Sequence, residues 1–321
     1  MNLARLALAL LVAIPGHGIA QDAFPSHPAS IIVPYSPGGA ADIIARPLAQ
    51  ALERELKQSF LVVNRPGASG AIGTQLCANA KADGYTLCVV VVQVSILPEV
   101  DALFGRTPSY TRDQLVGIAR LTAEPVVFMV GAKTPWKTLP GLLAAAKSKP
   151  NDIKYSTGGN YAGNHLPVAM LTQAAGVQLL AVPYKGGGPS MMAALGGEVA
   201  MTTQVPGVAH PHVSSGKMRA IAHSGVKPLQ DFPGVKSLKE LGYDVEFYLW
   251  AGLFAPRGMP GNVMNTLRGA TAKVMNSDEM RAAAVKIKTN LAFQDADEFQ
   301  KWWDADAARL IETVRRIGKI Q

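Results

Sequence analysis

Residues 31–42 read IIVPYSPGGAAD, and this stretch decides how the chain folds. The apolar run Ile31–Val33 ends in a turn rich in proline and glycine, and an amphipathic helical pattern follows at once. That order predicts a strand, a tight turn and a helix. Gly38 and Gly39 lack a β-carbon, so the backbone can turn sharply and approach a ligand closely. The free N–H groups and the dipole at the helix start favour a carboxylate or phosphate.

The same kind of junction recurs twice further along the chain. A strand, a glycine-rich loop and a helix are predicted across residues 153–165 and again across residues 179–195. In open α/β sheets, ligands bind outside the carboxyl ends of the strands, where such junctions lie. Hydroxyls, amides and one cation stand beside the glycines, at Ser36, Ser156, Thr157, Asn160, Tyr184 and Lys185. The pattern therefore predicts a binding site for a small anion.

Strands alternate with helices along most of the chain, which favours an α/β fold with mostly parallel sheets flanked by helices. Further strands are predicted at residues 60–63, 85–92, 126–130, 197–203, 218–223 and 250–254. Residues 98–116 are rich in turn formers and are predicted to be irregular. The chain beyond the Pro256/Pro260 turn is predicted to be helical, with Asp295 and Glu298 as a capping box before the last helix.

The composition is that of a globular protein with an export signal. The 321 residues are 48% hydrophobic and 17% charged, enough for two domains. At the start, Arg5 precedes nine apolar residues, Leu6–Ile14, and small residues follow up to Ala20. Because a bilayer span takes about 20 apolar residues, residues 1–20 are predicted to be a signal peptide cleaved near Ala20. The alternative is a retained N-terminal anchor.

The charge pattern speaks against nucleic acid as a partner. The formal net charge is +8, and cleavage would remove only Arg5 and leave +7. Lysines and arginines are scattered along the chain rather than clustered. We interpret the excess of positive charge as a feature that keeps the protein soluble and mildly attracts anions.

Two cysteines, Cys77 and Cys88, leave two possibilities open. In an oxidising compartment they can form one disulfide, which would join a predicted helix to the strand after it. They can equally remain two buried thiols. Neither lies in a motif that would make it catalytic.

Signatures of catalysis and of metal binding are weak. The sequence has no G-x-S-x-G elbow, no Walker loop and no G-x-G-x-x-G. Ser214–Lys217 fits S-x-x-K without its companion motifs, and the imidazoles of His210 and His212 lack a third ligand at suitable spacing. We therefore expect no enzyme activity, no metal and no cofactor. His165, beside the second glycine-rich loop, is either a structural histidine or a ligand contact.

Stretches spread over nearly the whole mature chain match one known family in its order. They are residues 33–42 with 45–46, 63–70, 83–87, 156–160 with 165–166, 182–187, 216–217 with 219–220, and 250 with 252–253 and 255–256. Each is weak alone, but together they resemble the periplasmic solute receptors of tripartite tricarboxylate transporters, also called Bug receptors.

The resemblance implies a two-lobed periplasmic-binding-protein fold, or Venus flytrap. Residues 21–124 and 248–321 would form lobe one, and residues 125–247 would form lobe two. It further implies a monomeric periplasmic receptor that closes on a small carboxylate and delivers it to the membrane subunits of its transporter. The implied ligand-binding residues are Tyr35, Ser36, Gly38, Gly39, Ala40, Asp42, Gln93, Ser156, Thr157, Gly158, Asn160, His165, Tyr184, Lys185, Gly186 and Gln204. Of these, Asp42 is expected to steady the helix start rather than touch the ligand.

Departures from the family pattern narrow the expected ligand. The family often has an acidic residue where this chain has Gln204, and small or polar residues where it has Val92–Ser95. An α-ammonium group buried in a closed cleft needs a carboxylate partner, so a carboxylate without an amine is expected. Two other functions remain open: a ligand-sensing flytrap that signals to a membrane partner, and a secreted α/β hydrolase.

Overall fold

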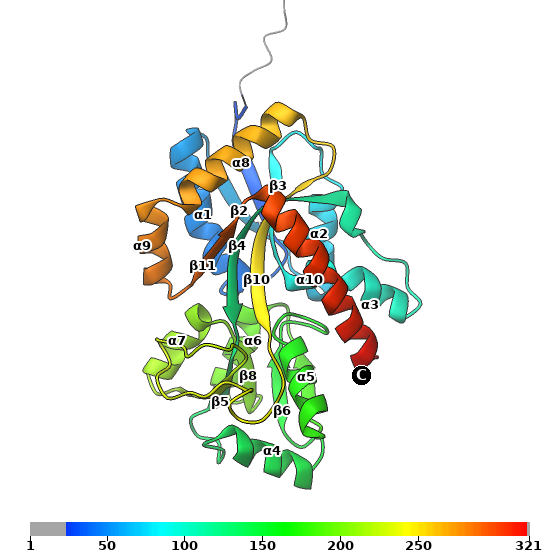
Figure 1. The fold of residues 1–321 in the computed structure, drawn as a ribbon, viewed down its shortest axis with the longest axis vertical. Helices are drawn as coiled ribbons and strands as arrows, with labels where there is room; N and C mark the ends of the chain where they lie inside the picture. The colour runs from blue at the N-terminus through cyan, green and yellow to red at the C-terminus, as the bar shows by residue number, and fades with distance from the viewer. Residues whose placement is uncertain (1–23, 320–321) are drawn as a thin grey trace, which may run out of the picture.

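Two sheets, each covered by helices, form the two halves of the molecule, one above the other in Figure 1. The computed structural model describes residues 24–319. The predicted signal peptide, residues 1–20, lies outside the described residues. Among the residues described, none of the helices has the length and apolar character needed to cross a membrane.

Lobe one is built on a six-stranded sheet with the order β11-β4-β10-β3-β1-β2. Its strands are β1 (Ala29–Val33), β2 (Phe60–Asn64), β3 (Thr86–Val91), β4 (Leu115–Pro125), β10 (Tyr248–Pro256) and β11 (Leu291–Gln294). Its helices are α1 (Ala40–Leu56), α2 (Ala71–Ala78), α3 (Leu97–Leu103), α8 (Gly261–Met275), α9 (Asp278–Lys286) and α10 (Ala296–Ile317), with short 3-10 turns at Ala68–Gly70, Val92–Ser95 and Arg112–Gln114.

Lobe two is built on a five-stranded sheet with the order β7-β6-β8-β5-β9. Its strands are β5 (Val127–Gly131), β6 (Lys154–Thr157), β7 (Leu180–Pro183), β8 (Met201–Gln204) and β9 (Met218–His223). Its helices are α4 (Leu139–Ser148), α5 (Leu166–Ala175), α6 (Gly187–Gly196) and α7 (Pro206–Ser214).

Both sheets are mixed, so the expectation of mostly parallel sheets is corrected. The parallel pairs are β1 with β2 and β3, and β6 with β7 and β8. Each of these follows a crossover helix, as parallel pairing requires. The antiparallel pairs involve the strands that carry the chain between lobes: β4 continues into β5, and β10 returns beside β4. Because β4 and β10 run between the lobes in opposite directions, they pair antiparallel.

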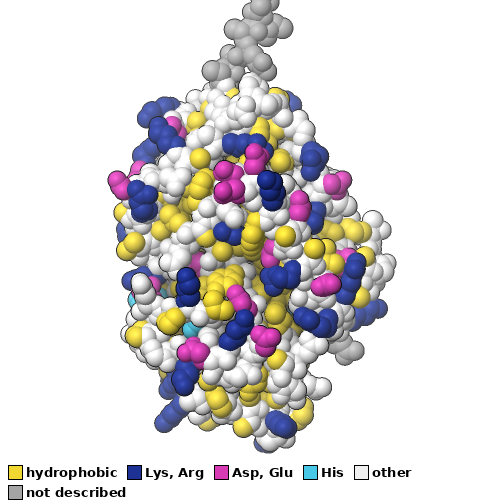
Figure 2. All heavy atoms as spheres, in the orientation of Figure 1, with side chains coloured by type: hydrophobic (Ala, Val, Ile, Leu, Met, Phe, Trp, Pro, Cys, Tyr) yellow, Lys and Arg dark blue, Asp and Glu magenta, His cyan; other side chains and the backbone are white. Residues whose placement is uncertain are grey.

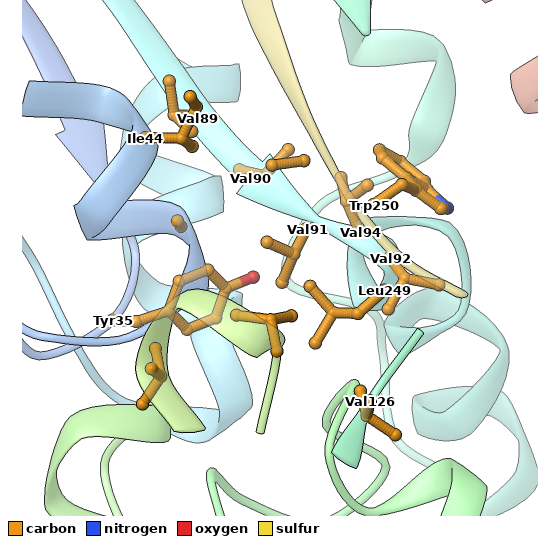
Figure 3. Packing of buried hydrophobic residues seen from close by; sticks show 14 of the residues in the cluster. Tyr35, Ile44, Val89, Val90, Val91, Val92, Val94, Val126, Leu249 and Trp250 are labelled. Carbon is orange, nitrogen blue, oxygen red and sulfur yellow. The ribbon is translucent and has the colours of Figure 1, made fainter. Parts of the chain in front are cut away.

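The connection between the lobes is held together by one serine. Val126 is buried between β4 and β5, and its N–H donates to Oγ of Ser224 at 2.9 Å. The same hydroxyl donates to the carbonyl of Phe247 at 2.6 Å, just before β10 begins. Ser224 therefore ties the outgoing and the returning chain to each other. Figure 3 shows Val126 below Leu249 of β10.

Cys77 of α2 and Cys88 of β3 are joined by a disulfide. Both side chains are buried in the core of lobe one, and their Cα atoms are 6.1 Å apart. The sequence leaves open a disulfide or two buried thiols, and the structure has the disulfide. The bond fixes α2 against the central part of the sheet.

Three stretches of the structure differ from the prediction. The strand β4, Leu115–Pro125, was not predicted, although it begins at the end of the region predicted to be irregular. Leu97–Leu103 is a helix within the region predicted to be irregular, because Pro98 occupies the first helical turn, where a missing N–H costs nothing. Leu291–Gln294 is a short edge strand in the region predicted to be helical. The junctions of strand, glycine-rich turn and helix are as expected.

Charged side chains are scattered over the face shown in Figure 2, with acidic ones among the basic.

Candidate ligand-binding site

A small cavity lies between the lobes, at the carboxyl ends of the parallel strands. Its volume is about 40 Å³. Lobe one contributes Tyr35, Gly39, Ala40, Ala41, Val91, Gln93 and Leu249, and lobe two contributes Gly158, Ala162, Gly163, Asn164, Gly186, Gly187, Gln204 and Val205. Because a buried water needs about 10–15 Å³, the cavity in this arrangement has room for roughly three waters.

The start of α1 forms one wall of the cavity. Gly39 is the N-cap residue, and the helix follows directly with Ala40 and Ala41. Asp42 accepts hydrogen bonds from the Gly38 N–H at 3.0 Å and from Arg46 at 2.8 Å. Burial acts to raise the pKa of Asp42, but hydrogen bonds from Arg46, Gly38 and Asn64 hold it below its ordinary value. Asp42 is thus an ionised side chain that steadies the turn, in agreement with the role expected for it.

Tyr35 forms the floor on the lobe-one side. Its ring is buried, and Figure 3 shows its hydroxyl pointing toward Val91. Burial raises the pKa of Tyr35 far above its ordinary range, so the hydroxyl stays protonated. The ring rests on Gly70, where an added β-carbon would lie 2.5 Å from the ring. The glycine is therefore required for this ring position.

Lobe two faces α1 with the start of a second helix and two amides. Gly186 is the N-cap residue of α6, and its φ of 119° is one that favours glycine. Gln204 at the end of β8 donates through Nε2 to the carbonyl of Gly187 at 3.0 Å. The Asn164 amide accepts from the Gly158 N–H at 2.7 Å. These bonds order the lining without any charged side chain.

The two helix starts meet almost backbone to backbone. The Ser36 N–H donates across the lobes to the carbonyl of Lys185 at 3.1 Å. A β-carbon added at Gly39 would lie 3.3 Å from the Gly187 nitrogen, and one added at Gly188 would lie 2.1 Å from the Pro37 carbonyl oxygen. We call residues 36–39 and 185–188 the glycine seam. The seam permits this approach only because its facing positions carry no side chain.

Of the residues predicted to bind ligand, seven line the cavity: Tyr35, Gly39, Ala40, Gln93, Gly158, Gly186 and Gln204. Ser36, Gly38 and Lys185 lie in the glycine seam beside it. Asn160 lies at the rim, where its carbonyl accepts from Ser69 of lobe one. The Tyr184 hydroxyl donates instead to Glu198 at 2.9 Å on the surface.

Three further predicted residues, Ser156, Thr157 and His165, are fully buried and turn away from the cavity. The Ser156 hydroxyl donates to the carbonyl of Ser190, and Thr157 bonds its own loop at Gly159. His165 accepts from the Tyr161 N–H at 2.9 Å and lines a separate surface pocket. Burial lowers its pKa to about 4 and keeps it neutral. Alternation along β6 points Ser156 and Thr157 to opposite faces, away from the strand end.

The sequence reasoning missed part of the lining. Asn164 and Gly163 stand next to the predicted loop, so the rule that amides gather at such loops could have found them. Ala41 and Gly187 extend turns already predicted. Val91, Leu249 and Val205 are ordinary apolar residues of strands and their ends, and nothing in the sequence distinguishes them from the core.

The lining of the cavity combines uncharged side chains with the starts of two helices. None of the described residues that line the cavity is charged, and none is a histidine. Residues at the starts of α1 and α6, where the first N–H groups of a helix have no partner within it, line the cavity from both lobes. A nucleophile with a neighbouring base is not among the lining residues.

Comparisons with known proteins agree with this geometry. A family model described as the tripartite tricarboxylate transporter family receptor matches residues 44–319. Protein BugT of Bordetella pertussis is 31% identical over 322 residues, which covers 94% of this chain and 96% of BugT. The solved structure of the periplasmic binding protein BugD gives a TM-score of 0.86 at 25% identity and covers 92% of this chain and 99% of BugD.

A further neighbour, an R. palustris protein solved with adipate, gives a TM-score of 0.85 at 24% identity, over 92% of this chain and 98% of that one. At that identity the likeness concerns the fold alone. The expected two-lobed periplasmic-binding-protein fold is confirmed by these neighbours.

Proposed function

This chain belongs to the tripartite tricarboxylate transporter receptor family, and from that premise we propose that it captures a small carboxylate by lobe closure. It is a solute receptor and not an enzyme. The carboxylate lies between the lobes against the starts of α1 and α6.

One observation carries the proposal: two helix starts meet beside a cavity whose described lining residues carry no charge. Each helix start carries a partial positive charge equivalent to about half an elementary charge. Two such ends close to one another repel, and an anion in the cavity that both line offsets the repulsion and can accept from their N–H groups. Closure is then favoured because only the closed form contacts the ligand from both lobes.

The amide of Gln204 selects against amino acids. Its Nε2 is engaged by the carbonyl of Gly187, and its environment in the cavity offers no carboxylate for an ammonium group. An α-ammonium group would be buried without a counter-charge, which is costly. The ligand is therefore an organic acid without an amine.

The receptor acts in the periplasm as a monomer and delivers its acid to the membrane subunits of a tripartite tricarboxylate transporter. Membership of the receptor family supports the location and the partner. The predicted signal peptide supports export.

The direct test is a thermal-shift screen of the full mature chain. Mono-, di- and tricarboxylates, with adipate among them, are compared with amino acids, sugars and divalent metals. An acid at 100 times its dissociation constant should stabilise the protein by about 2.7 kcal/mol. A sugar or metal that raises the melting temperature, with no effect of any carboxylate, would contradict the proposal.

The ligand class is tested by Gln204→Asp. The new carboxylate should weaken binding of the acid by repulsion and improve the relative affinity for the corresponding amino acid. Isothermal titration of both ligands measures the ratio of the two affinities. Gln50→Asp, on the exposed face of α1, is the control and should leave that ratio unchanged. An unaltered ratio in Gln204→Asp would count against the argument.

A further inference from the structure

Ser69 lies in a strained loop of lobe one that touches lobe two. Four consecutive residues have positive φ: Gly67 at 142°, Ala68 at 46°, Ser69 at 55° and Gly70 at 101°. Two of them, Ala68 and Ser69, are not glycine, and an L-residue with such a φ carries backbone strain. A conformation of this kind persists only where the surrounding contacts determine it.

Those contacts cross the gap between the lobes. The Ser69 hydroxyl donates to the carbonyl of Asn160 in lobe two at 2.8 Å. Opposite it stands Gly159, where an added β-carbon would lie 2.4 Å from the Ser69 Oγ. The glycine at 159, with φ of 128°, therefore leaves room for the hydroxyl.

Gln93 adds a second bond between the same two loops. Its Oε1 accepts from the Gly163 N–H of lobe two at 3.2 Å, while its Nε2 lies 3.4 Å from the Ser69 carbonyl. Gln93 lines the cavity, but Ser69 does not. The strained loop also supports the ring of Tyr35 through Gly70. Ser69 thus borders the site without reaching the ligand position.

We propose that Ser69 is a positioning residue for closure: its hydroxyl, bonded to Asn160, stabilises the closed form and so sets how long a bound carboxylate stays. The part of this inference that concerns ligand retention rests on the proposed function, in which lobe closure holds the carboxylate. A bond present only in the closed form shifts the equilibrium by its own free energy. One hydrogen bond is worth about 1 kcal/mol, or about fivefold in the ratio of closed to open molecules.

The equilibrium is measured by spin labels on Gln50→Cys in α1 and Ala144→Cys in α4, both at exposed positions. The native cysteines are bonded to each other and do not take the label. Pulsed electron resonance gives the distance distribution between the lobes in this parent chain without added ligand. Ser69→Ala should lower the ratio of closed to open molecules about fivefold.

Two variants separate the hydroxyl from the backbone strain. Ser69→Gly also lacks the hydroxyl but relieves the positive φ, so it should open the lobes as much as Ser69→Ala. Ser148→Ala removes a hydroxyl that bonds only its own helix at Ala145, and should match the parent. Identical distances in Ser69→Ala and the parent would overturn the proposal. So would opening in Ser69→Ala with parental distances in Ser69→Gly.

The ligand readout uses adipate, or the strongest acid from the screen, as the probe. Its dissociation rate should rise about fivefold in Ser69→Ala, with a much smaller change in the association rate. If no carboxylate binds the parent chain, the proposed function fails, while the distance measurement still decides the role of Ser69. An unchanged dissociation rate beside an opened distance distribution would remove the link to ligand retention.

Discussion

Glu124 is a buried carboxyl at the end of β4, where the chain leaves lobe one. It pairs across the strands with Leu249, which lines the cavity. Its Oε1 accepts the Asn290 N–H at 3.1 Å. Burial raises the pKa of Glu124 to about 8, against a smaller lowering by that hydrogen bond. The folded protein therefore keeps this carboxyl protonated at neutral pH.

Stability should consequently fall as the pH rises from about 4.5 to about 8. In that range the unfolded chain has lost the proton and the folded chain still holds it, so this group lowers the free energy of unfolding by about 1.4 kcal/mol per pH unit. Below that range the contribution is constant, and above it the loss is complete. Glu124→Gln should flatten the profile in urea unfolding measured at several pH values. Glu312→Gln, at an exposed site, should not.

At the scale of residues, the sequence located the glycines of the site better than its polar side chains. Gly39, Gly158 and Gly186 were predictable, because a sharp turn before a helix has few alternatives to glycine. Ser156 and His165 were placed at the site by nearness in sequence. Their direction depends on the face of β6 and on how α5 sits on the sheet, and a loop motif does not determine either.

The disulfide acts at the scale of elements, because it joins α2 to β3. In the chain-entropy picture, closing a loop of about a dozen residues stabilises by about 3 kcal/mol. Cys77→Ala with Cys88→Ala should therefore lower the free energy of unfolding by about that amount, with an additional cost from the truncated buried side chains. Reduction of the parent under denaturing conditions, followed by alkylation and refolding, is the comparison. Equal stability of the oxidised parent and the double variant would exclude a stabilising role.

Long periodic elements could be predicted, and short ones packed by their neighbours could not. The apolar stripe of α1 and the Asp295 cap of α10 are visible in the sequence, and the Asp295 carboxylate accepts the N–H groups of Asp297 and Glu298. β11 has four half-buried residues and pairs only with β4. Its conformation comes from the strand beside it, so local pattern carries little signal for it.

At the scale of the whole molecule, the glycine seam determines whether the lobes can meet. A methyl group at Gly188 would overlap the Pro37 carbonyl oxygen, so Gly188→Ala should hold the lobes apart and weaken carboxylate binding at least tenfold. Gly196→Ala, in the same helix with nothing within 4 Å of the added carbon, is the matched control. Small-angle scattering and titration measure both effects. Parental affinity in Gly188→Ala would show that the seam does not close on the ligand.

The two-lobed arrangement and its closure on a ligand followed from the family resemblance, but the contacts by which the two lobes meet did not. Strand and helix order places the glycine-rich turns at the ends of the two sheets. How tightly the turns meet depends on contacts such as Ser36 with Lys185, which join residues far apart in the sequence. No local sequence motif predicts such contacts.

The contacts between the lobes beside the cavity impose an order of events on the receptor. The glycine seam and the bond from Ser69 to Asn160 hold the lobes together, so molecules in this arrangement must first separate their lobes to admit an acid and then close around it. The rate of lobe opening then sets an upper limit on the rate of ligand binding. In stopped-flow mixing, the observed binding rate should level off at high acid concentration, at the rate constant for separation of the two lobes. The glycine seam would thus affect how fast a ligand enters as well as how firmly it is held.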